Sequence, residues 1–442
     1  MKGRVLLVNP WVYDFTAFDL WAKPLGLLYL GAHLKRRGWQ VTLLDCMDRL
    51  DPGMTESRSG SRRLRESGCG GYAKEVVVKP PFFEGIPRFF SRFGLPLQYV
   101  REKLAFMEPP DLVLLTCGMT YWYPGAVLMG ELVKTVFPST PVWLGGVYPT
   151  LCPEHARGWG FDRVVTTVDP LQVLRQIGDL LGEDFGVGGY GDFFAVHPDF
   201  SLYPQLAYQV VLTSVGCPFH CSYCASKTLY PSFFHRSWEE VWGEICFGFE
   251  TFGVQHFAFY DDALLFQAEG TFLPLLREVC QKCLPIFFHL PNGIHARYVT
   301  KELALLMCEA GFRTIRLSLE TVFESSQKET GGKVNREDFE RAVTYLREAG
   351  FTEKELEVYL LFGRPGSSEE EIRASVEYVR KMGLIPRLAL YAPTPRTALY
   401  QTLPEFIRKE PLWHNKIAYL YAMGNAPLYE VLQQRGGEMV CR

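Results

Sequence analysis

Short apolar runs alternate with longer amphipathic stretches over residues 1–181. The apolar runs predict strands at 4–8, 40–45, 111–116, 141–144 and 162–166. The amphipathic stretches predict helices at 24–37, 124–136 and 171–181. Alternation of this kind is typical of a parallel sheet covered by helices on both faces, and right-handed crossovers make such a sheet doubly wound. We therefore predict an α/β domain with a doubly wound parallel sheet over residues 1–181.

One long insertion, at about residues 50–108, interrupts this alternation. Its first part (51–71) is rich in Gly, Ser and Arg, including Arg58, Arg62 and Arg63, and its second part (82–104) is rich in aromatic residues. Long insertions in compact domains serve as lids or binding loops, or remain solvated loops. The composition leaves a lid and a solvated loop equally open.

The alternation restarts after residues 182–203, whose Gly, Phe and Asp content predicts a linker. Strands are predicted at 209–214, 256–260, 285–290, 314–319, 357–362 and 387–391. Capping-box spacing marks two of the intervening helices, in the pairs Ser237 with Glu240 and Ser367 with Glu370. Six strand–helix units predict a partial (β/α)6 barrel over 204–400, with its site at the C-terminal ends of the strands. A small helical extension is expected at 401–442.

The composition fits this picture of a folded, multidomain protein. A chain of 442 residues, with 48% hydrophobic and 21% charged residues, predicts roughly two to three domains. The net charge of −3 argues against a protein that coats nucleic acids. No apolar signal core precedes the first strand, and no apolar run is long enough to span a bilayer. We therefore expect a cytoplasmic protein without a membrane span.

Three of the twelve cysteines are bunched at the end of the barrel's first strand. Cys217, Cys221 and Cys224 have the spacing C-x3-C-x2-C. Three close thiolates suit three irons of a [4Fe–4S] cluster and leave the fourth iron open to a ligand. Zinc is the main alternative, but it requires four ligands, and the extra candidate His220 is adjacent to Cys221. Chance grouping is the third interpretation.

The full motif, Cys-Pro-Phe-His-Cys-Ser-Tyr-Cys over 217–224, resembles the signature of radical S-adenosylmethionine (SAM) enzymes, C-x3-C-x-aromatic-C. The likeness extends over about residues 208–400. It implies that the open iron binds SAM and that an electron from the cluster cleaves SAM to methionine and a 5′-deoxyadenosyl radical. It also implies an external one-electron reductant such as flavodoxin or ferredoxin.

The same resemblance implies SAM contacts at the ends of successive barrel strands. By position along the chain these are Tyr223, Tyr260, Asp261, Asp262, Asn292, Ser318, Glu320 and Gly363. Paired acids after a strand also occur as helix caps, so that interpretation of Asp261 and Asp262 stays open, as does a surface position for Glu320. At the end of the sixth strand, Arg396 stands where the family usually has Gly.

The first domain resembles the cobalamin-binding domains of radical SAM enzymes, which have a sheet of the Rossmann or flavodoxin type. The likeness rests on Lys-Pro-Leu-Gly-Leu-Leu-Tyr-Leu at 23–30 and on Leu-Gly-Gly-Val-Tyr-Pro-Thr at 144–150. It implies cobalamin contacts at the strand ends, namely Pro24, Leu25, Thr116, Thr120, Gly145, Gly146, Tyr148, Thr150 and Thr166. The cobalt-ligating motif D-x-H-x-x-G is absent from the sequence, because Pro153 precedes His155 where Asp is required. His33 is expected to pack within the first helix.

Three hypotheses follow. The leading one is a cobalamin-dependent radical SAM enzyme that methylates an unactivated carbon. The second is a radical SAM enzyme without cobalamin, or with a second cluster at Cys46, Cys117 and Cys152 as in methylthiotransferases. The third is a non-enzymatic metal- or corrinoid-binding protein. The sequence identifies neither the substrate nor a catalytic acid or base, and no nucleic-acid partner is expected.

Overall fold

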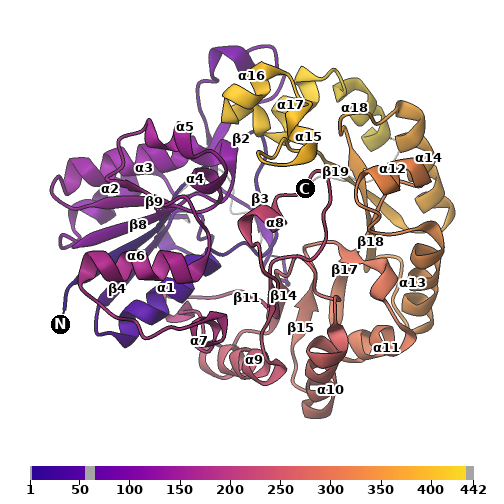
Figure 1. Ribbon diagram of the computed structural model, residues 1–442, viewed down its shortest axis with the longest axis horizontal. Helices are drawn as coiled ribbons and strands as arrows, with labels where there is room; N and C mark the ends of the chain where they lie inside the picture. The colour runs from indigo at the N-terminus through magenta and orange to yellow at the C-terminus, as the bar shows by residue number, and fades with distance from the viewer. Residues whose placement is uncertain (1, 55–64, 435–442) are drawn as a thin grey trace. The chain divides into compact units, whose positions relative to one another are not determined.

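The computed structural model describes residues 2–54 and 65–434. The chain forms two compact units (Figure 1). Unit 1 comprises Met1–Ala207 together with Lys409–Asn415, and unit 2 comprises Tyr208–Arg408 together with Lys416–Arg442. The division at residue 207 follows the segment expected to be a linker, and a short piece of the expected C-terminal extension belongs to unit 1.

Unit 1 contains a five-stranded parallel sheet in the order β10-β9-β8-β1-β4. Its strands are β1 (Arg4–Asn9), β4 (Gln40–Asp45), β8 (Leu112–Thr116), β9 (Val142–Gly145) and β10 (Arg163–Val164). The central strand is apolar on both faces, and its residues Val5–Val8 are at most 1% exposed, because helices cover both sides. The doubly wound α/β fold predicted from the alternation is confirmed.

The main helices of unit 1 are α1 (Leu25–Arg36), α2 (Leu97–Ala105), α3 (Tyr123–Val136) and α6 (Pro170–Leu181). The expected linker at 182–203 is partly packed against α1 through α7 (Tyr190–Phe194) and the short helix η4 (Phe200–Leu202). His33 of α1 lies 3.0 Å from the Phe193 carbonyl, and Phe193 is only 2% exposed. The segment expected to be a linker is thus packed in part, because Phe193 and Phe194 enter the core. His33 is packed there, as predicted.

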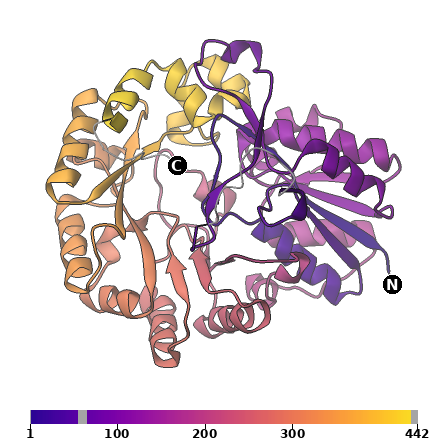
Figure 2. The same ribbon diagram turned by 180° about the vertical axis from the view of Figure 1, so that it is seen from behind.

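Much of the insertion is folded. Strands β2 (Val12–Asp14), β7 (Ser91–Phe93) and β6 (Lys74–Val76) form an antiparallel sheet, seen from behind in Figure 2. A second small pair joins β3 (Phe18–Asp19) to β5 (Gly70–Gly71). Phe15, Phe83 and Phe90 pack together beneath these strands. A purely solvated loop is thereby ruled out for the described part. Residues 55–64, with Arg58, Arg62 and Arg63, lie outside the described residues.

A segment from near the end of the chain, Lys409–Asn415, belongs to unit 1. It contains the short helix η7 (Pro411–His414). Trp413 contacts the rings of Phe82 and Phe83 in the insertion. The Asn415 amide donates a hydrogen bond to the buried Asp14 carboxylate at 2.8 Å. Unit 1 is therefore built from two stretches of sequence that are widely separated along the chain.

Unit 2 contains six parallel strands in the order β11-β14-β15-β17-β18-β19, with β16 paired to β17. The strands are β11 (Gln209–Val211), β14 (His256–Phe259), β15 (Phe287–His289), β16 (Ile294–His295), β17 (Phe312–Glu320), β18 (Leu356–Phe362) and β19 (Ile385–Leu390). The sequential order and the intervening helices, among them α9 (Trp238–Phe252), α10 (Phe272–Lys282), α11 (Lys301–Glu309), α13 (Arg336–Glu348) and α14 (Glu369–Lys381), are those of the predicted partial barrel.

Of the two predicted helix caps, that of α9 is at the expected residue and that of α14 lies one residue later than expected. Ser237 caps α9 by accepting from the Glu240 amide at 3.2 Å, as expected. The cap of α14 is Ser368, which accepts from the Glu371 amide at 3.0 Å. Ser367 instead donates to the Arg364 carbonyl, because the preceding Arg-Pro-Gly turn is one residue longer than the spacing suggested.

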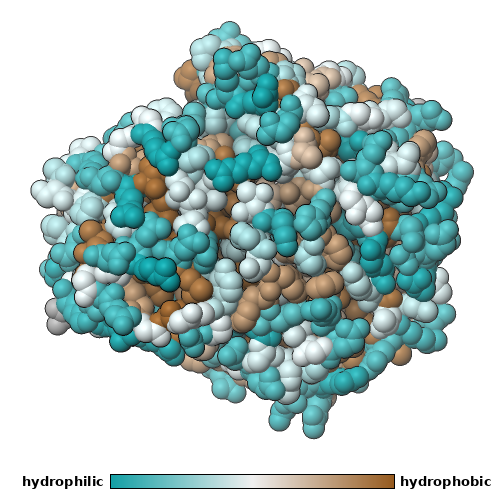
Figure 3. All heavy atoms as spheres, viewed as in Figure 1, coloured by the Kyte–Doolittle hydropathy of each residue, from teal (hydrophilic) through white to brown (hydrophobic). Residues whose placement is uncertain are grey.

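The described helices offer no membrane span, since none of them is both long enough and apolar enough to cross a bilayer. The face of the molecule drawn in Figure 3 is covered mainly by hydrophilic residues, with apolar side chains in smaller patches between them.

Candidate active site

The three bunched cysteines lie on a loop that follows β11 and the short strand β12 (Ser214–Val215). Gly216 starts the loop with φ +82°, and a Cβ atom there would lie 2.6 Å from the Ser232 carbonyl oxygen. Only glycine fits that backbone without a shift. Cys217 is buried, Cys221 is half-buried and Cys224 is exposed, and all three are free thiols. The solvent exposure of the three cysteines therefore increases along the loop, from Cys217 to Cys224.

The donor set of this loop fits an iron–sulfur cluster. The Ser226 amide donates to Cys224 Sγ at 3.5 Å, and the Cys224 thiol donates to the Ser226 hydroxyl at 3.3 Å, so one backbone donor already faces a sulfur. Within the described part of the chain, no three His, Cys, Asp or Glu side chains gather around a point that could hold a single metal ion. A cubane places each thiolate on a different iron, so its three ligands need not share such a point.

Burial and nearby charges act together on these thiols. Burial raises the pKa of Cys217, and the Asp262 carboxylate adds to this rise. Burial also raises the pKa of Cys221 to about 11; Glu320 adds to the rise and Lys333 opposes it. Asp262, which follows β14, and Glu320, which ends β17, are therefore close enough to the cysteine loop to change the pKa of its thiols.

Asp261, expected to contact SAM, is committed elsewhere. Its Oδ1 accepts from the Thr213 amide (3.0 Å) and hydroxyl (2.7 Å) and from the Ser214 amide and hydroxyl (both 2.6 Å). The side chain is 4% exposed. It therefore joins the end of β14 to the start of the cysteine loop. Asp261 thus has a structural role at this point, and the SAM contact expected of it stays a prediction.

The neighbouring positions remain open. Asp262 is exposed to solvent. Asn292 is also exposed, and its amide nitrogen donates to the carbonyls of Tyr260 (3.1 Å) and Asp261 (3.3 Å). Asn292 therefore fastens the end of β15 to that of β14 and leaves its side-chain oxygen available. Of the two acids, Asp262 is the one exposed to solvent, and its contact with SAM stays a prediction.

A second polar group forms where β17 ends. Glu320 has a φ of +66°, and the pairing of β17 with β18 shifts register between Ser318 and Glu320. The Tyr223 hydroxyl donates to Glu320 Oε1. A left-handed backbone at a non-glycine residue costs free energy and is common at functional sites. The structure thus brings together three residues predicted from separate motifs, Tyr223, Ser318 and Glu320.

Lys333 completes this group and was missed by the sequence analysis. Its Nζ lies 3.1 Å from Ser318 Oγ and 3.7 Å from Glu320 Oε1. The preceding Gly331 has φ +115°, and a Cβ atom there would lie 3.1 Å from Cys221 Cα. The only signal in the sequence was Gly-Gly-Lys at 331–333, which indicates a tight turn without naming its neighbour.

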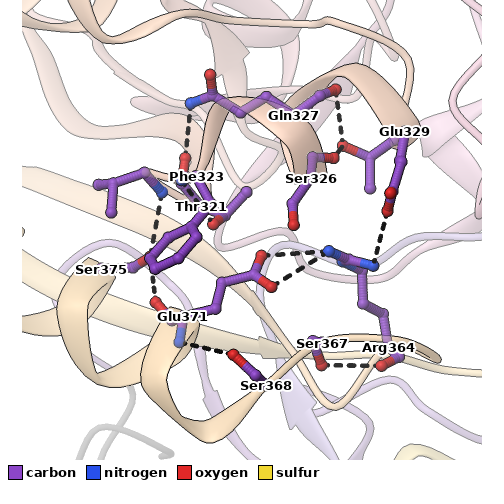
Figure 4. Close-up of polar contacts among 12 residues, drawn as sticks. Thr321, Phe323, Ser326, Gln327, Glu329, Arg364, Ser367, Ser368, Glu371 and Ser375 are labelled. Atoms are coloured by element: carbon purple, nitrogen blue, oxygen red, sulfur yellow. Dashed lines mark hydrogen bonds and ion pairs between the residues drawn. The ribbon is translucent and has the colours of Figure 1, made fainter.

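The turn after β18 combines an open glycine with a buried arginine. Gly363 has φ +78°, and a Cβ atom there would have only one neighbour within 4 Å, Asn425 Nδ2 at 3.8 Å. The next residue, Arg364, pairs with Glu371 at 3.2 Å and Glu329 at 3.8 Å (Figure 4). The ion pairs hold the turn against α14, which leaves Gly363 accessible at the strand end.

Arg396, noted as replacing a usual glycine, does adopt the backbone conformation that glycine favours. Its φ is +66°, and its side chain is exposed. The glycine-like geometry of this turn is therefore kept, at the steric cost of a Cβ atom.

At the C-terminal edge of the sheet in unit 1, two predicted strand ends meet. Gly146 has φ +97°, and a Cβ atom there would lie 2.7 Å from the Cys117 carbonyl oxygen and 2.8 Å from Thr116 Oγ1. The Thr150 hydroxyl donates to the Gly146 carbonyl at 2.8 Å. The double glycine after β9 thus lets the next turn lie directly against the end of β8, where a doubly wound sheet binds its ligand.

Thr120, also on the β8 side of this edge, has an unexpected partner. Its hydroxyl shares a hydrogen bond of 2.9 Å with Nδ1 of His414, which is fully buried. Of the remaining predicted contacts, Pro24, Gly145 and Thr166 are half-buried, and Leu25 is buried at the start of α1. No pattern in the sequence pairs Thr120 with a residue almost three hundred positions away.

Tyr148 does not lie open at this edge. It is fully buried, its hydroxyl lies 2.6 Å from Nδ1 of His155, and it accepts from the Trp159 indole at 3.1 Å. Its ring stacks on that of Tyr123. Its hydroxyl and ring are used in an aromatic cluster, and the cobalamin contact expected of Tyr148 stays a prediction. His155 belongs to that cluster as well.

The cysteines considered for a second cluster are mostly buried. Cys46 and Cys117 are buried and Cys152 is half-buried. Burial raises the pKa of Cys46 and Cys117 well above the ordinary value, and the Cys117 thiol donates to the Met119 carbonyl. This is the environment of small apolar core residues.

Comparison with known proteins identifies the second unit. Residues 211–379 match the Radical SAM superfamily. The chain contains a radical SAM domain. It is 22% identical over 386 residues to an uncharacterized methyltransferase of Pyrococcus horikoshii, covering 74% of this chain and 82% of the relative. It is 24% identical to cytidylyl-2-hydroxyethylphosphonate methyltransferase of Streptomyces wedmorensis, and the match covers 86% of this chain and 77% of that relative.

The fold of this radical SAM protein extends the likeness to both units. The radical SAM methyltransferase TsrM from Kitasatospora setae, solved with cobalamin and a [4Fe–4S] cluster, aligns with a TM-score of 0.64 at 17% identity. The alignment covers 90% of this chain and 74% of that one. The two proteins share the fold of a doubly wound domain followed by a partial barrel.

Proposed function

We propose that this protein is a cobalamin-dependent radical SAM methyltransferase that acts on an unactivated carbon. The observation that carries the proposal is the convergence of the free thiols of the 217–224 loop with Glu320, Lys333 and Asp262 at the strand ends of a radical SAM barrel. Methyl transfer is supported by the names of the similar proteins, which are methyltransferases.

The residues of unit 2 suit the binding of SAM beside a cluster held by Cys217, Cys221 and Cys224. When bound, the reduced cluster supplies the electron that breaks the S–C5′ bond of SAM. The exposed Asp262 carboxylate suits the SAM amino group, and the Lys333 ammonium suits its carboxylate. Glu320, pinned by Tyr223, suits the ribose hydroxyls, because a carboxylate accepts two hydrogen bonds at once.

The edge of unit 1 suits a large flat ligand. Glycines and threonines at 116, 145–146 and 166 expose the backbone there, and small residues let a corrin ring approach closely. No histidine motif is available for the lower face of cobalt, so we propose that cobalamin binds without that ligand. We further propose a cytoplasmic location and reduction by a flavodoxin or ferredoxin.

The test is a metal count on protein expressed with cobalamin and purified without oxygen. We expect about four iron and about one cobalt per chain, followed by reductant-dependent release of 5′-deoxyadenosine from SAM. Replacing Cys217, Cys221 and Cys224 by Ala should abolish iron binding. A matched double variant, C280A with C283A, alters another closely spaced pair of free thiols and should leave the iron count unchanged.

Each outcome decides between the hypotheses. Four iron without cobalt would keep the radical SAM chemistry and overturn the cobalamin assignment. About eight iron would indicate a second cluster and direct attention to Cys46, Cys117 and Cys152. Zinc that persists after anaerobic iron–sulfide reconstitution would refute the cluster.

A further inference from the structure

The inside of the barrel is open to solvent along its last two strands. In β18, Leu356, Val358 and Leu360 are fully buried, whereas the alternate residues 357, 359 and 361 are half-buried. Successive side chains of a strand point to opposite faces, and the buried set faces the covering helices. The partly exposed set therefore lines the inside of the barrel. All six residues of β19 are half-buried as well.

Two arginines share one glutamate on this inner face. Arg316 of β17 donates from Nε to Glu357 Oε2 at 2.8 Å and from Nη1 to the Pro291 carbonyl at 3.0 Å. Arg387 of β19 donates from Nη2 to Glu357 Oε1. One carboxylate thus faces two guanidinium groups, so this group of three carries a net positive charge.

The positive charge is not fully matched by hydrogen bonds. Arg387 Nε is buried and has no hydrogen-bond partner among the residues that the structure describes. The Arg387 side chain as a whole is 29% exposed, compared with 10% for Arg316 and 12% for Glu357. An unmet charged donor is costly, and a guanidinium fork is suited to bind an oxyanion. Arg387 is therefore the member of the group that an external anion could reach.

The position of Arg387 links it to the SAM site. In the sheet register, Ser318 pairs with Tyr359 and Tyr359 pairs with Arg387. The three residues thus form one row across neighbouring strands. Ser318 is hydrogen-bonded to Lys333 in the polar group at the end of β17. An anion on Arg387 would therefore lie in the row of the barrel that carries Ser318.

We propose that Arg387, backed by Arg316, binds an anionic oxygen group of the substrate, of the phosphonate, phosphate or carboxylate class. This inference rests on the proposed function, since it assigns the substrate class of the same barrel. Glu357 holds the two guanidiniums in place in the absence of that anion and competes with it for them.

Methylphosphonate is the probe for this site. The full-length, cluster-loaded protein is titrated with it by calorimetry, at constant ionic strength and with SAM saturating, so that the binding site for the SAM carboxylate is already filled. We expect saturable binding that R387Q weakens by about tenfold or more. R387K, which keeps the charge but loses the fork, should fall in between. The matched control is R373Q, which alters an exposed arginine paired with Glu369 and should bind like wild type.

A second variant gives a change of opposite sign. E357Q removes the internal competitor, so we expect methylphosphonate to bind several-fold more tightly than to wild type. Thermal melting and iron content of each variant show whether it is folded and loaded, and R387K provides the test if E357Q does not fold.

The outcomes separate this inference from the proposed function. Absence of saturable binding to wild type, or equal loss in R387Q and R373Q, would overturn the anion site even if the protein holds iron and cleaves SAM. If the wild-type protein binds methylphosphonate through Arg387 but holds no iron after reconstitution, the anion site stands and the proposed function fails.

Discussion

The clamp made by Asp261 offers the sharpest test of how the barrel holds its cysteine loop. The D261N substitution preserves the shape of the side chain but removes its charge. The carboxylate accepts from four donor groups, the amides and hydroxyls of Thr213 and Ser214. An amide keeps one acceptor oxygen, which can still meet the donors on Oδ1, and turns the other into a donor. The bond from the Thr213 amide to Oδ2, at 3.2 Å, should therefore be lost.

The expected magnitude follows from these contacts. A hydrogen bond to a charged group contributes about 1.5–3 kcal/mol, so the loss of the bond to Oδ2 predicts a destabilisation of about 1.5–3 kcal/mol. This is in the upper part of the usual range for a single substitution. Because the clamp ends two residues before Gly216, the cysteine loop should lose order first and the iron content after reconstitution should fall.

Hydrogen exchange of the apo protein locates the effect. The amides of Thr213 and Ser214 should exchange much faster in D261N, and the urea midpoint should fall. D262N is the matched control, because Asp262 is exposed and makes no such set of bonds. Substitutions at the surface usually change the free energy of unfolding by no more than about 0.5 kcal/mol. Unchanged protection of the two amides in D261N, or an equal effect of D262N, would refute the clamp.

Three further predictions concern other parts of the chain. Replacing Gly216 by Ala should lower iron retention, because a Cβ atom there would lie 2.6 Å from a carbonyl oxygen; iron content after gel filtration checks this, and retention equal to wild type would contradict it. Burial, and secondarily His256, lowers the pKa of His289 to about 3, so the stability that depends on its neutral form is present above about pH 6.5 and is lost as pH falls. The expected loss is about 1.4 kcal/mol at pH 5.5; H289N should flatten the change in urea midpoint between pH 7.5 and 5.5, and an unaltered slope would count against it. Replacing His414 by Ala should weaken cobalamin retention without changing iron content, whereas H414Q, with a side-chain amide that can still reach Thr120, should restore part of it; equal losses of both metals would point to general unfolding instead.

The sequence was sufficient for features that depend on local pattern. Strand–helix alternation predicted both sheets, and Gly216 and the three cysteines were adjacent in sequence to the strand that positions them. The capping serine of α14 was missed by one residue because the turn length before it depends on Arg364 and its buried pairing with Glu371.

Features that depend on distant contacts were out of reach. Asp261 and Asp262 look alike in sequence, and only the approach of Thr213 and Ser214 distinguishes them. Tyr148 follows the Gly-Gly turn as a ligand contact would, but the aromatic neighbours Tyr123 and Trp159 draw it into the core. Lys333 follows a Gly-Gly turn, and no spacing in the sequence indicates that this turn lies beside Ser318 and Glu320.

The return of Lys409–Asn415 into unit 1 has a consequence for how the protein is made. Domains generally fold as they emerge from the ribosome, N-terminal part first. Here the first unit still lacks Trp413, His414 and Asn415 when the whole barrel has already been synthesised. Its folding is therefore completed only after the barrel strands have been synthesised, and a fragment ending at residue 207 is an incomplete domain that would need residues 409–415 supplied, in trans or by fusion, to close its core.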